Sequence, residues 1–450
     1  MKREILEQAL NEISDRHITE AAGKKRQLPI GWIASVAAAL AVVILCVSVL
    51  QPFSVAKAVA EAEYPKYEWQ YRGKQTGQVL PLLTDFFTQS MAQTLSGSSE
   101  NQTYSPINLY MALCLLAETS DSNEQILSLL NADSREALRE QANLIWNATY
   151  YDQKDKTLLA NSVWLDEGLN YNKLVMDTLA SSYYTSVYRS DLQSAKTGSA
   201  IKDWLSAQTG NVLKSDIDRL DVDDLTVMLL YSTVYYQAKW SDTSKFNAAA
   251  NTDGTFHAPG GNVDCTYMNK KEMQTNYYWT EDFGAISLSL KDSSRMWLLL
   301  PDADKTTDDV FSCPELAPLL FGSEYENNKY VKVNLSLPKF DIRSSGDLKE
   351  DLQAMGVTDV FGAGSADFSG TLYAHKDFEA FSPYISAVNQ ATRVAIDEKG
   401  VTAASYIALP AAGAAPPPDE IIDFVLDRPF VFVITNRYDL PLFAGVVNEP

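Results

Sequence analysis

Small or apolar residues alternate with other residues along segment 401–409. Val401, Ala403, Ser405, Ile407 and Leu409 fall on one side of an extended chain; Thr402, Ala404, Tyr406 and Ala408 fall on the other. This period of two predicts a strand with one buried face. The next residues, 410–420, read PAAGAAPPPDE, which predicts an exposed extended loop. The combination favours a loop that can insert into a sheet, although an edge strand followed by a linker has the same local pattern.

Other segments predict a mixture of helices and strands. Residues 79–91 place apolar side chains on one helical face, and residues 331–337 alternate as a strand does until Pro338. Residues 225–236 and 430–434 are continuous runs of mainly β-branched, aliphatic and aromatic residues, as expected of central strands covered on both faces. Helices come mainly early and strands late, so the pattern predicts an α+β fold with large mixed or antiparallel sheets. Residues 80–400 contain no repeat or linker, which favours one large domain.

The N-terminal residues have a different pattern. Residues 1–22 predict an amphipathic helix, which is typical of a solvated or membrane-surface helix and also of a docking helix for a cytosolic partner. Residues 31–50 carry no charge and follow the cluster Lys24, Lys25 and Arg26. As a helix this run would span ~30 Å, the thickness of the hydrocarbon core. The basic cluster predicts that residues 1–30 stay in the cytoplasm.

We therefore expect an uncleaved signal-anchor at 31–50, an interfacial stalk at 51–76 and a folded extracellular domain at 77–450. The competing interpretation is a cleavable signal, because Ala58, Val59 and Ala60 resemble a cleavage site. The apolar run is longer than a typical signal core, and the site lies ten residues beyond it. Cleavage after Ala60 would instead leave a secreted protein.

Composition excludes several classes of function. The net charge is −21, and the first 30 residues hold six Lys or Arg against five Asp or Glu, so the negative charge belongs to the remainder. This argues against nucleic acid or another polyanion as a partner. Of the four cysteines, Cys46 lies in the apolar run and the other three show no metal-type spacing. The three histidines form no ligand or triad pattern, so we expect no metal, no cofactor and no enzymatic activity.

Six motifs occur in a familiar order. They are DEKGVTAAS at 397–405, NQTYSP at 101–106, IKDW at 201–204 with Thr209 and Gly210, the run from Leu229 to Trp240, LPKF at 337–340 with Asp347 to Phe361, and DRPF at 427–430 with LFAG at 442–445 and NEP at 448–450. Together they resemble the serpin family over roughly residues 77–450. The resemblance implies a single serpin-like domain with large β-sheets, about eight to nine helices and an exposed reactive-centre loop.

The resemblance also implies a function, the suicide inhibition of serine proteases. The cleaved loop would enter a sheet as a new strand and trap the acyl-enzyme. The matching hinge residues are Glu398, Gly400, Val401, Ala403, Ala404 and Ser405, and the matching sheet-opening residues are Asn101, Ser105, Pro106, Gln390 and Trp240. Two departures from the family pattern stand out. Gln390 replaces a common histidine but can still hydrogen-bond to Ser105 or Asn101, and Ser232 and Thr233 replace Asn and Ala.

The loop tip predicts the target. Family spacing of about sixteen residues from Glu398 puts the reactive bond at Ala414 and Ala415, with alternatives at Ala412 and Gly413. No Arg, Lys or large aromatic residue stands within 408–418, which favours an elastase- or subtilisin-like protease. Pro410 departs from the pattern, because proline deletes one ladder bond.

We expect a monomeric, membrane-anchored inhibitor, and a bacterial source. Two alternatives remain open: a non-inhibitory serpin acting as a binding or chaperone module, and a transmembrane signalling protein that uses residues 1–22 as its output.

Overall fold

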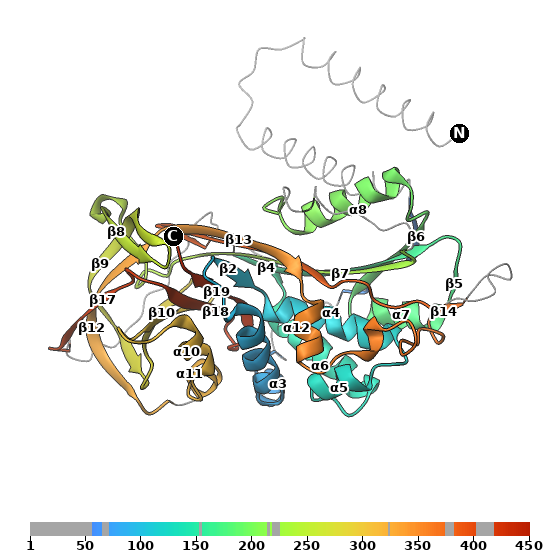
Figure 1. The fold of residues 1–450 in the computed structure, drawn as a ribbon, viewed down its shortest axis with the longest axis horizontal. Coiled ribbons are helices and arrows are strands. Elements are labelled where there is room, and N and C mark those ends of the chain that lie inside the picture. Colours follow the sequence, from blue (N-terminus) through green and yellow to red (C-terminus); the bar gives the residue numbers. More distant parts are fainter. Residues whose placement is uncertain are drawn as a thin grey trace, which may run out of the picture. The chain divides into compact units, whose positions relative to one another are not determined.

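The computed structural model describes residues 56–64, 72–152, 155–213, 217, 226–322, 325–373, 382–401 and 418–450 (Figure 1). Val55–Pro450 form one compact unit. The segments predicted as cytoplasmic helix, signal-anchor and loop tip, residues 1–22, 31–50 and 410–417, lie outside the described residues. None of the helices in the described ranges combines the length and apolar character that a membrane crossing requires.

The first sheet, of eight strands, contains the segments that flank the predicted hinge. Its strand order is β1 (Lys57–Ala60), β6 (Thr185–Ser190), β4 (Lys156–Asp166), β7 (Met228–Lys239), β16 (Gly400–Val401), β15 (Asn389–Asp397) and β13 (Phe340–Asp347), with β3 (Tyr151–Asp152) paired to β4. β16 is antiparallel to both β7 and β15, so these two long strands run parallel to each other.

The second sheet has nine strands and holds the C-terminal part of the chain. Its order is β17 (Ile421–Val425), β12 (Asn328–Pro338), β9 (Gly261–Trp279), β10 (Phe283–Ser289), β11 (Arg295–Pro301), β18 (Phe430–Thr435), β19 (Pro441–Val447) and β2 (Gln102–Tyr104), with β8 (Thr252–Ala258) paired to β9. The strands β5 (Asn170–Tyr171) and β14 (Leu372–Tyr373) form a separate pair. The apolar run predicted as a central strand at 430–434 is fully buried in β18.

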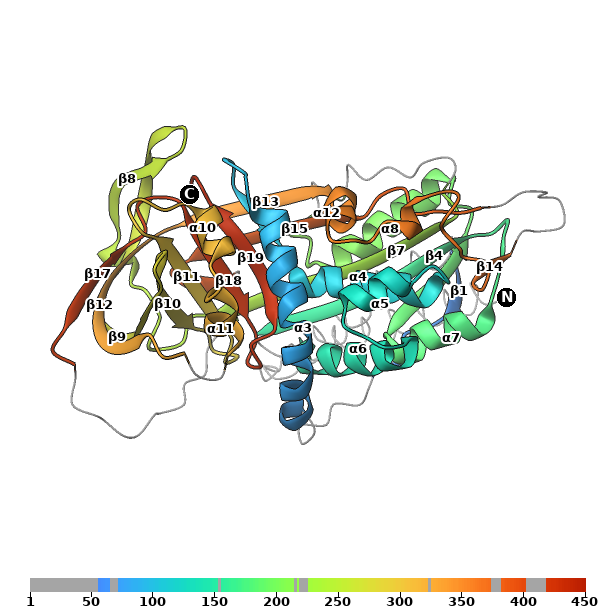
Figure 2. The ribbon, with the colours of Figure 1, turned by 60° about the horizontal axis from the view of Figure 1, so that its bottom comes forward.

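Nine α-helices lie within the described residues, in agreement with the predicted α+β class. They are α3 (Arg72–Leu95), α4 (Pro106–Thr119), α5 (Glu124–Leu129), α6 (Arg135–Thr149), α7 (Lys173–Ser182), α8 (Ala195–Gln208), α10 (Thr307–Ser312), α11 (Leu316–Phe321) and α12 (Lys349–Ala354). Helix α8 covers one face of the first sheet, whereas α4, α5, α6 and α7 lie on the other (Figures 1 and 2). The main core lies on the α4 side, and a smaller cluster around Trp164 and Trp204 lies under α8.

The start of α4 shows how local chemistry positions a predicted site. Ser105 has extended backbone dihedrals, and its hydroxyl accepts a hydrogen bond from the Asn108 N–H, as an N-cap residue does. Pro106 follows at the first helical position, where its missing N–H costs nothing. The helix is almost entirely buried, so its start is fixed beneath the first sheet.

Residues 56–64, which the sequence assigns to a stalk, instead belong to the folded unit. β1 pairs antiparallel with β6 and forms the edge of the first sheet, and Ala56 is buried. Tyr64 is 50% exposed but stacks on Trp146, with ring centroids 5.5 Å apart, and also contacts Tyr150 and Tyr184. Helix α3 then begins before residue 77. The domain boundary predicted at 77 is therefore corrected to about residue 55, because strand pairing and ring stacking hold this segment.

We predict that Tyr64→Ala destabilises the domain by about 1–2 kcal/mol, because the stacked ring is lost. Thermal unfolding should show a melting temperature a few degrees lower. Tyr64→Phe keeps the ring and is the matched control, with a melting temperature near that of the unmodified protein. Equal melting temperatures for the Ala and Phe variants would show that residue 64 does not hold the segment to the domain.

Candidate functional site

The first sheet is interrupted between β7 and β15. In the described part of the chain no ladder bond joins these strands directly; only the two residues of β16 pair with both, at one end. Along most of its length, β7 pairs only with β4, and β15 pairs only with β13. We call the space between their facing edges the slot. Such edges can pair with one further strand.

Two cavities occupy the slot. The near cavity, adjacent to β16, measures about 330 Å³ and lies between residues 231–236 of β7, residues 389–393 of β15 and the C-terminal end of α8. The far cavity measures about 600 Å³ and reaches from residues 226–232, at and just before the start of β7, to α4 and to residues 382–390. The slot therefore has room for side chains on both faces of the sheet.

Gly400 and Val401 close the end of the slot. The Gly400 φ angle of +146° suits glycine, and a Cβ atom there would lie 2.3 Å from the Ala238 carbonyl oxygen and 2.6 Å from the Lys239 Cα. A larger residue would push β16 away from β7. Val401 pairs with Ala238 and is buried, so it lies on the face on which the alternation places it.

Glu398 precedes this strand and is held by two side chains. Its carboxylate lies 2.5 Å from the Lys339 ammonium and accepts a hydrogen bond from the Asn251 amide. Burial alone would raise the pKa of Glu398, but the bonds from Lys339 and Asn251 outweigh it and lower the pKa from 4.5 to about 2. The carboxylate is therefore ionised at every pH above about 4, and the hinge is tied to β12 and β13.

Trp240 also holds the turn between β15 and β16, through two hydrogen bonds to the backbone of that turn. Its indole N–H donates to the Asp397 carbonyl oxygen at 2.7 Å, and its backbone N–H donates to the Lys399 carbonyl oxygen. The ring is buried and packs edge-on against Phe246. Trp240 thus fixes the backbone of the hinge, in addition to filling core space.

Ser105 and Gln390 form a pair of hydrogen bonds at the level of the near cavity. The Ser105 N–H donates to Gln390 Oε1 at 2.9 Å, and the Gln390 Nε2 donates to the Ser105 carbonyl oxygen at 3.1 Å. The Ser105 hydroxyl donates to the Leu442 carbonyl oxygen at 2.7 Å. These bonds link β15 to the start of α4 and to β19.

The other predicted residues of this group are placed differently. Asn101 does not contact Gln390; its carboxamide oxygen accepts bonds from the backbone N–H groups of Asn448 and Glu449. These bonds hold the C-terminal residues against the segment that leads into β2, the edge strand of the second sheet. Pro106 acts through the helix start described above.

Sequence reasoning missed several residues that hold the slot. The Thr392 hydroxyl donates to the Thr103 carbonyl oxygen at 2.7 Å, and the Thr103 N–H donates to Ser344 Oγ at 2.8 Å. Lys339 and Asn251 were missed as partners of Glu398. Thr392 could have been found from the sequence, because a polar residue among the apolar residues of one strand face indicates a buried hydrogen bond. The hinge residues Ala403, Ala404 and Ser405 and the reactive-bond candidates Ala412, Gly413, Ala414 and Ala415 lie outside the described residues.

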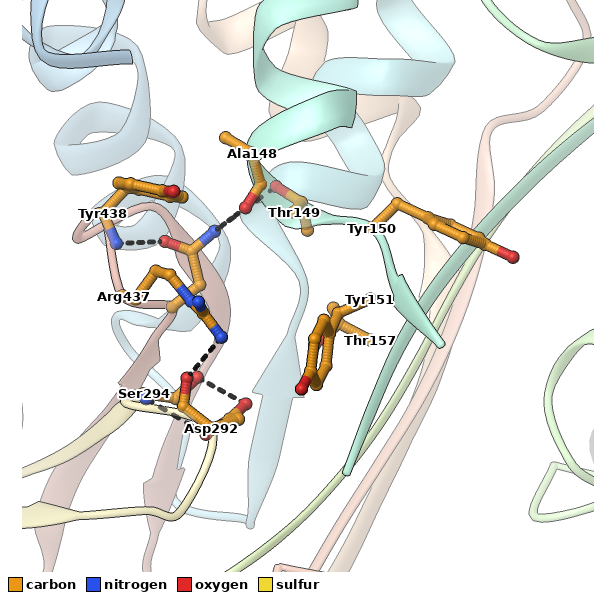
Figure 3. Close-up of a pocket in the computed structure, with 10 residues that line it drawn as sticks. Ala148, Thr149, Tyr150, Tyr151, Thr157, Asp292, Ser294, Arg437 and Tyr438 are labelled. Atoms are coloured by element: carbon orange, nitrogen blue, oxygen red, sulfur yellow. Dashed lines mark hydrogen bonds between the residues drawn. The ribbon is translucent and has the colours of Figure 1, made fainter. Parts of the chain in front are cut away.

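A third cavity, drawn in Figure 3, is much smaller. It measures about 20 Å³ and is lined by residues such as Asp292, Asn436 and Arg437. Arg437 donates to the Asp292 backbone oxygen at 2.9 Å, and Asn436 Nδ2 donates to the Ala148 carbonyl oxygen. Burial raises the pKa of Asp292. The space suffices for about one water molecule, so this junction fits a packing role and not a substrate site. The described residues also contain no group of three or more acidic, His or Cys side chains arranged for a metal ion.

We predict that Glu398→Gln lowers the melting temperature of the uncleaved protein at pH 7 by a few degrees, or about 1 kcal/mol. Because the folded-state pKa is depressed, this stabilisation is present above about pH 4.5 and is lost as the pH falls towards 2. The difference between the variant and the unmodified protein should therefore shrink over that window.

The matched control is Glu420→Gln, because Glu420 pairs with Lys329 while both side chains are about half exposed. We expect this control to have little effect, since exposed pairs contribute little. An equal effect of both substitutions would contradict a special role for Glu398.

Comparisons with known proteins agree with this architecture. A family profile described as "Serpin (serine protease inhibitor)" matches residues 83–450. Serpin-ZX of Arabidopsis thaliana is 24% identical over 373 residues, covering 79% of this chain and 94% of that protein. Plasminogen activator inhibitor 1 of Neovison vison is 26% identical over 389 residues, covering 82% and 92%.

Among solved structures, the thermophilic serpin Tengpin in the native state superposes with a TM-score of 0.74 at 22% identity, covering 88% of this chain and all of that chain. The relatives named above are a plant and an animal protein, so they give no support for the expected bacterial source. The profile match spans most of the domain that holds the slot, the hinge and the Ser105–Gln390 pair, and this chain belongs to the serpin family.

Proposed function

We propose that this serpin inhibits serine proteases by inserting its cleaved loop, residues 402–409, into the slot. The observation that carries the proposal is the pair of unpaired edges on β7 and β15, closed at one end by β16. The chain continues from β16 directly into the alternating segment that the sequence predicts as a strand.

The energetic case rests on backbone hydrogen bonds. A strand entering between β7 and β15 gains about two ladder bonds per residue. At a net ~0.5–1.5 kcal/mol each, eight residues contribute roughly 10–20 kcal/mol, before the entropy of ordering the loop is subtracted. This exceeds the roughly 1 kcal/mol assigned above to the contacts of Glu398, so those contacts would not prevent insertion once cleavage frees the loop.

The proposed targets are elastase- or subtilisin-like proteases. Residues 408–418 contain only Ala, Leu, Gly and Pro, so a pocket for small side chains accepts the loop, whereas a pocket for Arg, Lys or a large aromatic ring gains little. The proposed reactive bond joins Ala414 to Ala415, with Ala412 and Gly413 as the alternatives.

The test incubates the purified protein with a panel of serine proteases. We expect an SDS-stable complex with an elastase- or subtilisin-like enzyme, and a large rise in melting temperature after the loop is nicked. Mass spectrometry of the released peptide identifies the reactive bond. A rise without a stable complex would indicate a non-inhibitory serpin, and no rise would exclude insertion.

Two variants sharpen this test. Ala403→Asp places a charge on the face that faces the main core, next to Tyr236 in the register of β16, and burying that charge costs several kcal/mol. We expect this variant to be cleaved as a substrate with little complex. Thr402→Asp adds the same charge on the opposite face and should retain most of the complex. The reverse result would show that the assigned faces are exchanged.

We also propose that residues 31–50 remain attached and hold the domain at the outer face of a membrane. The support comes from the sequence: a charge-free run of spanning length and a basic cluster before it. An attached inhibitor would protect proteins of the same cell surface.

Terminal sequencing of the mature protein tests the anchor. We expect the native N-terminus to be retained and the protein to fractionate with membranes after alkaline washing. A mature chain that starts at Glu61, found in the medium, would overturn the anchor. Such cleavage would also remove β1, so this outcome predicts a domain that lacks that edge strand.

A further inference from the structure

We infer that Tyr406 is the residue that seats the inserted strand, and that the near cavity is the binding site for its ring. This assignment rests on the loop insertion proposed above and adds to it a specific register and a specific side chain. It follows from the pairing of β16, the sizes of the side chains along β7 and β15, and the position of the near cavity.

The register follows from the two residues already paired. Gly400 is opposite Lys239 and Val401 opposite Ala238 on β7; on β15, Val401 is opposite Ile396. Continuing the same antiparallel ladder without a bulge puts residue 406 opposite Thr233 and Ala391. Directly opposite residues share a face of the sheet.

The side-chain sizes along this face are complementary. The outer face of β7, under α8, presents Tyr235, Thr233 and Tyr231 in succession. The inserted segment would oppose them with Ala404, Tyr406 and Ala408. Each large residue of the loop or the strand therefore meets a small one.

The opposite edge repeats the pattern. Along β15 the neighbours of residues 404, 406 and 408 in this register are Arg393, Ala391 and Asn389. The smallest of these, Ala391, again stands opposite Tyr406. On the α8 face, the slot thus has one position at which the neighbours on both β7 and β15 are small. Tyr406, the one aromatic residue of segment 402–409, falls at that position.

The near cavity lies at this position. Thr233 and Ala391 both line it, together with Leu205 of α8 and with Val212 and Leu213 in the turn that follows α8. Its volume of about 330 Å³ would be shared by the backbone of the inserted strand and the ring, and a cavity of about 150 Å³ is enough for benzene. The Thr233 hydroxyl already donates to the Ala160 carbonyl oxygen at 3.1 Å, so it needs no partner from the inserted strand.

The register is tested by disulfide trapping in the full-length protein after the loop is nicked. Ala404→Cys with Tyr235→Cys places two thiols at an opposed pair, where Cα separations suit a disulfide. The control, Ala404→Cys with Val234→Cys, moves the partner to the other face. We expect mild oxidation to cross-link the first pair and not the second, as mapped by mass spectrometry. Preferential cross-linking of the control pair would overturn the register.

The role of the ring is tested by the rise in melting temperature on nicking, measured for each variant against its own uncleaved form. We expect Tyr406→Ala to lose about 5 °C or more of the rise, and Tyr406→Phe to keep most of it. The double variant Ala404→Tyr with Tyr406→Ala should lose more than Tyr406→Ala alone, because it moves the ring between Tyr235 and Arg393.

The outcomes separate this inference from the proposed function. A full rise in the unmodified protein together with an unchanged rise in Tyr406→Ala overturns the seating role and leaves insertion intact. No rise in the unmodified protein overturns insertion, and the seating role with it. A rise that depends on the ring at 406 and not at 404 supports both.

Discussion

The facing edges of β7 and β15, which within the described residues share only the short strand β16, are the constraint on which the rest of the structure depends. Backbone N–H and C=O groups inside a sheet need partners, and an open edge invites any available strand. Here the strand that fits is covalently attached, because β16 occupies the first two positions between the edges. Gly400 makes this attachment fit, since a Cβ atom would collide with the backbone of β7.

Two polar contacts beside the slot, at Ser105 and at Glu398, involve no group that titrates near neutral pH. At Ser105, the partner is the Gln390 amide, which carries no proton equilibrium. At Glu398, the pKa is lowered to about 2, so the carboxylate stays charged through the neutral range. Many relatives are expected to carry histidine at the position of Gln390. An amide there makes the strength of this contact independent of pH, which fits the proposal that cleavage of the loop changes the sheet.

Local patterns in the sequence predicted the features that neighbouring residues determine, such as the face of a strand on which a side chain lies. The period of two placed Val401 on the buried face, and the apolar runs marked β7 and β18 as central strands. The Gln390 contact with Ser105 could be anticipated because the family resemblance brought the two segments together. The contacts of Glu398 with Lys339 and Asn251 could not, since those partners are distant in sequence and carry no local signature. Strand β1 was missed for a related reason: Lys57–Ala60 is short, and it is ordered by pairing with β6 and by the Tyr64 stack.

Helix α8 covers one face of the first sheet, and its C-terminal end lies beside the slot. Trp204 of α8 packs in a cluster with Trp164 and Tyr188, which belong to β4 and β6. The same cluster extends to Tyr231 of β7 and Ala391 of β15, and the C-terminal end of the helix borders the near cavity. The proposed insertion would bring a strand against this border of the cluster, whereas the contact between the Trp164 and Tyr188 rings lies on β4 and β6. The main core on the opposite face is larger and is continuous with α4, so each new residue on that face gains a packed surface as it enters. In the proposed insertion, the new strand therefore gains contacts with the main core, and the Trp164–Tyr188 contact stays outside the slot.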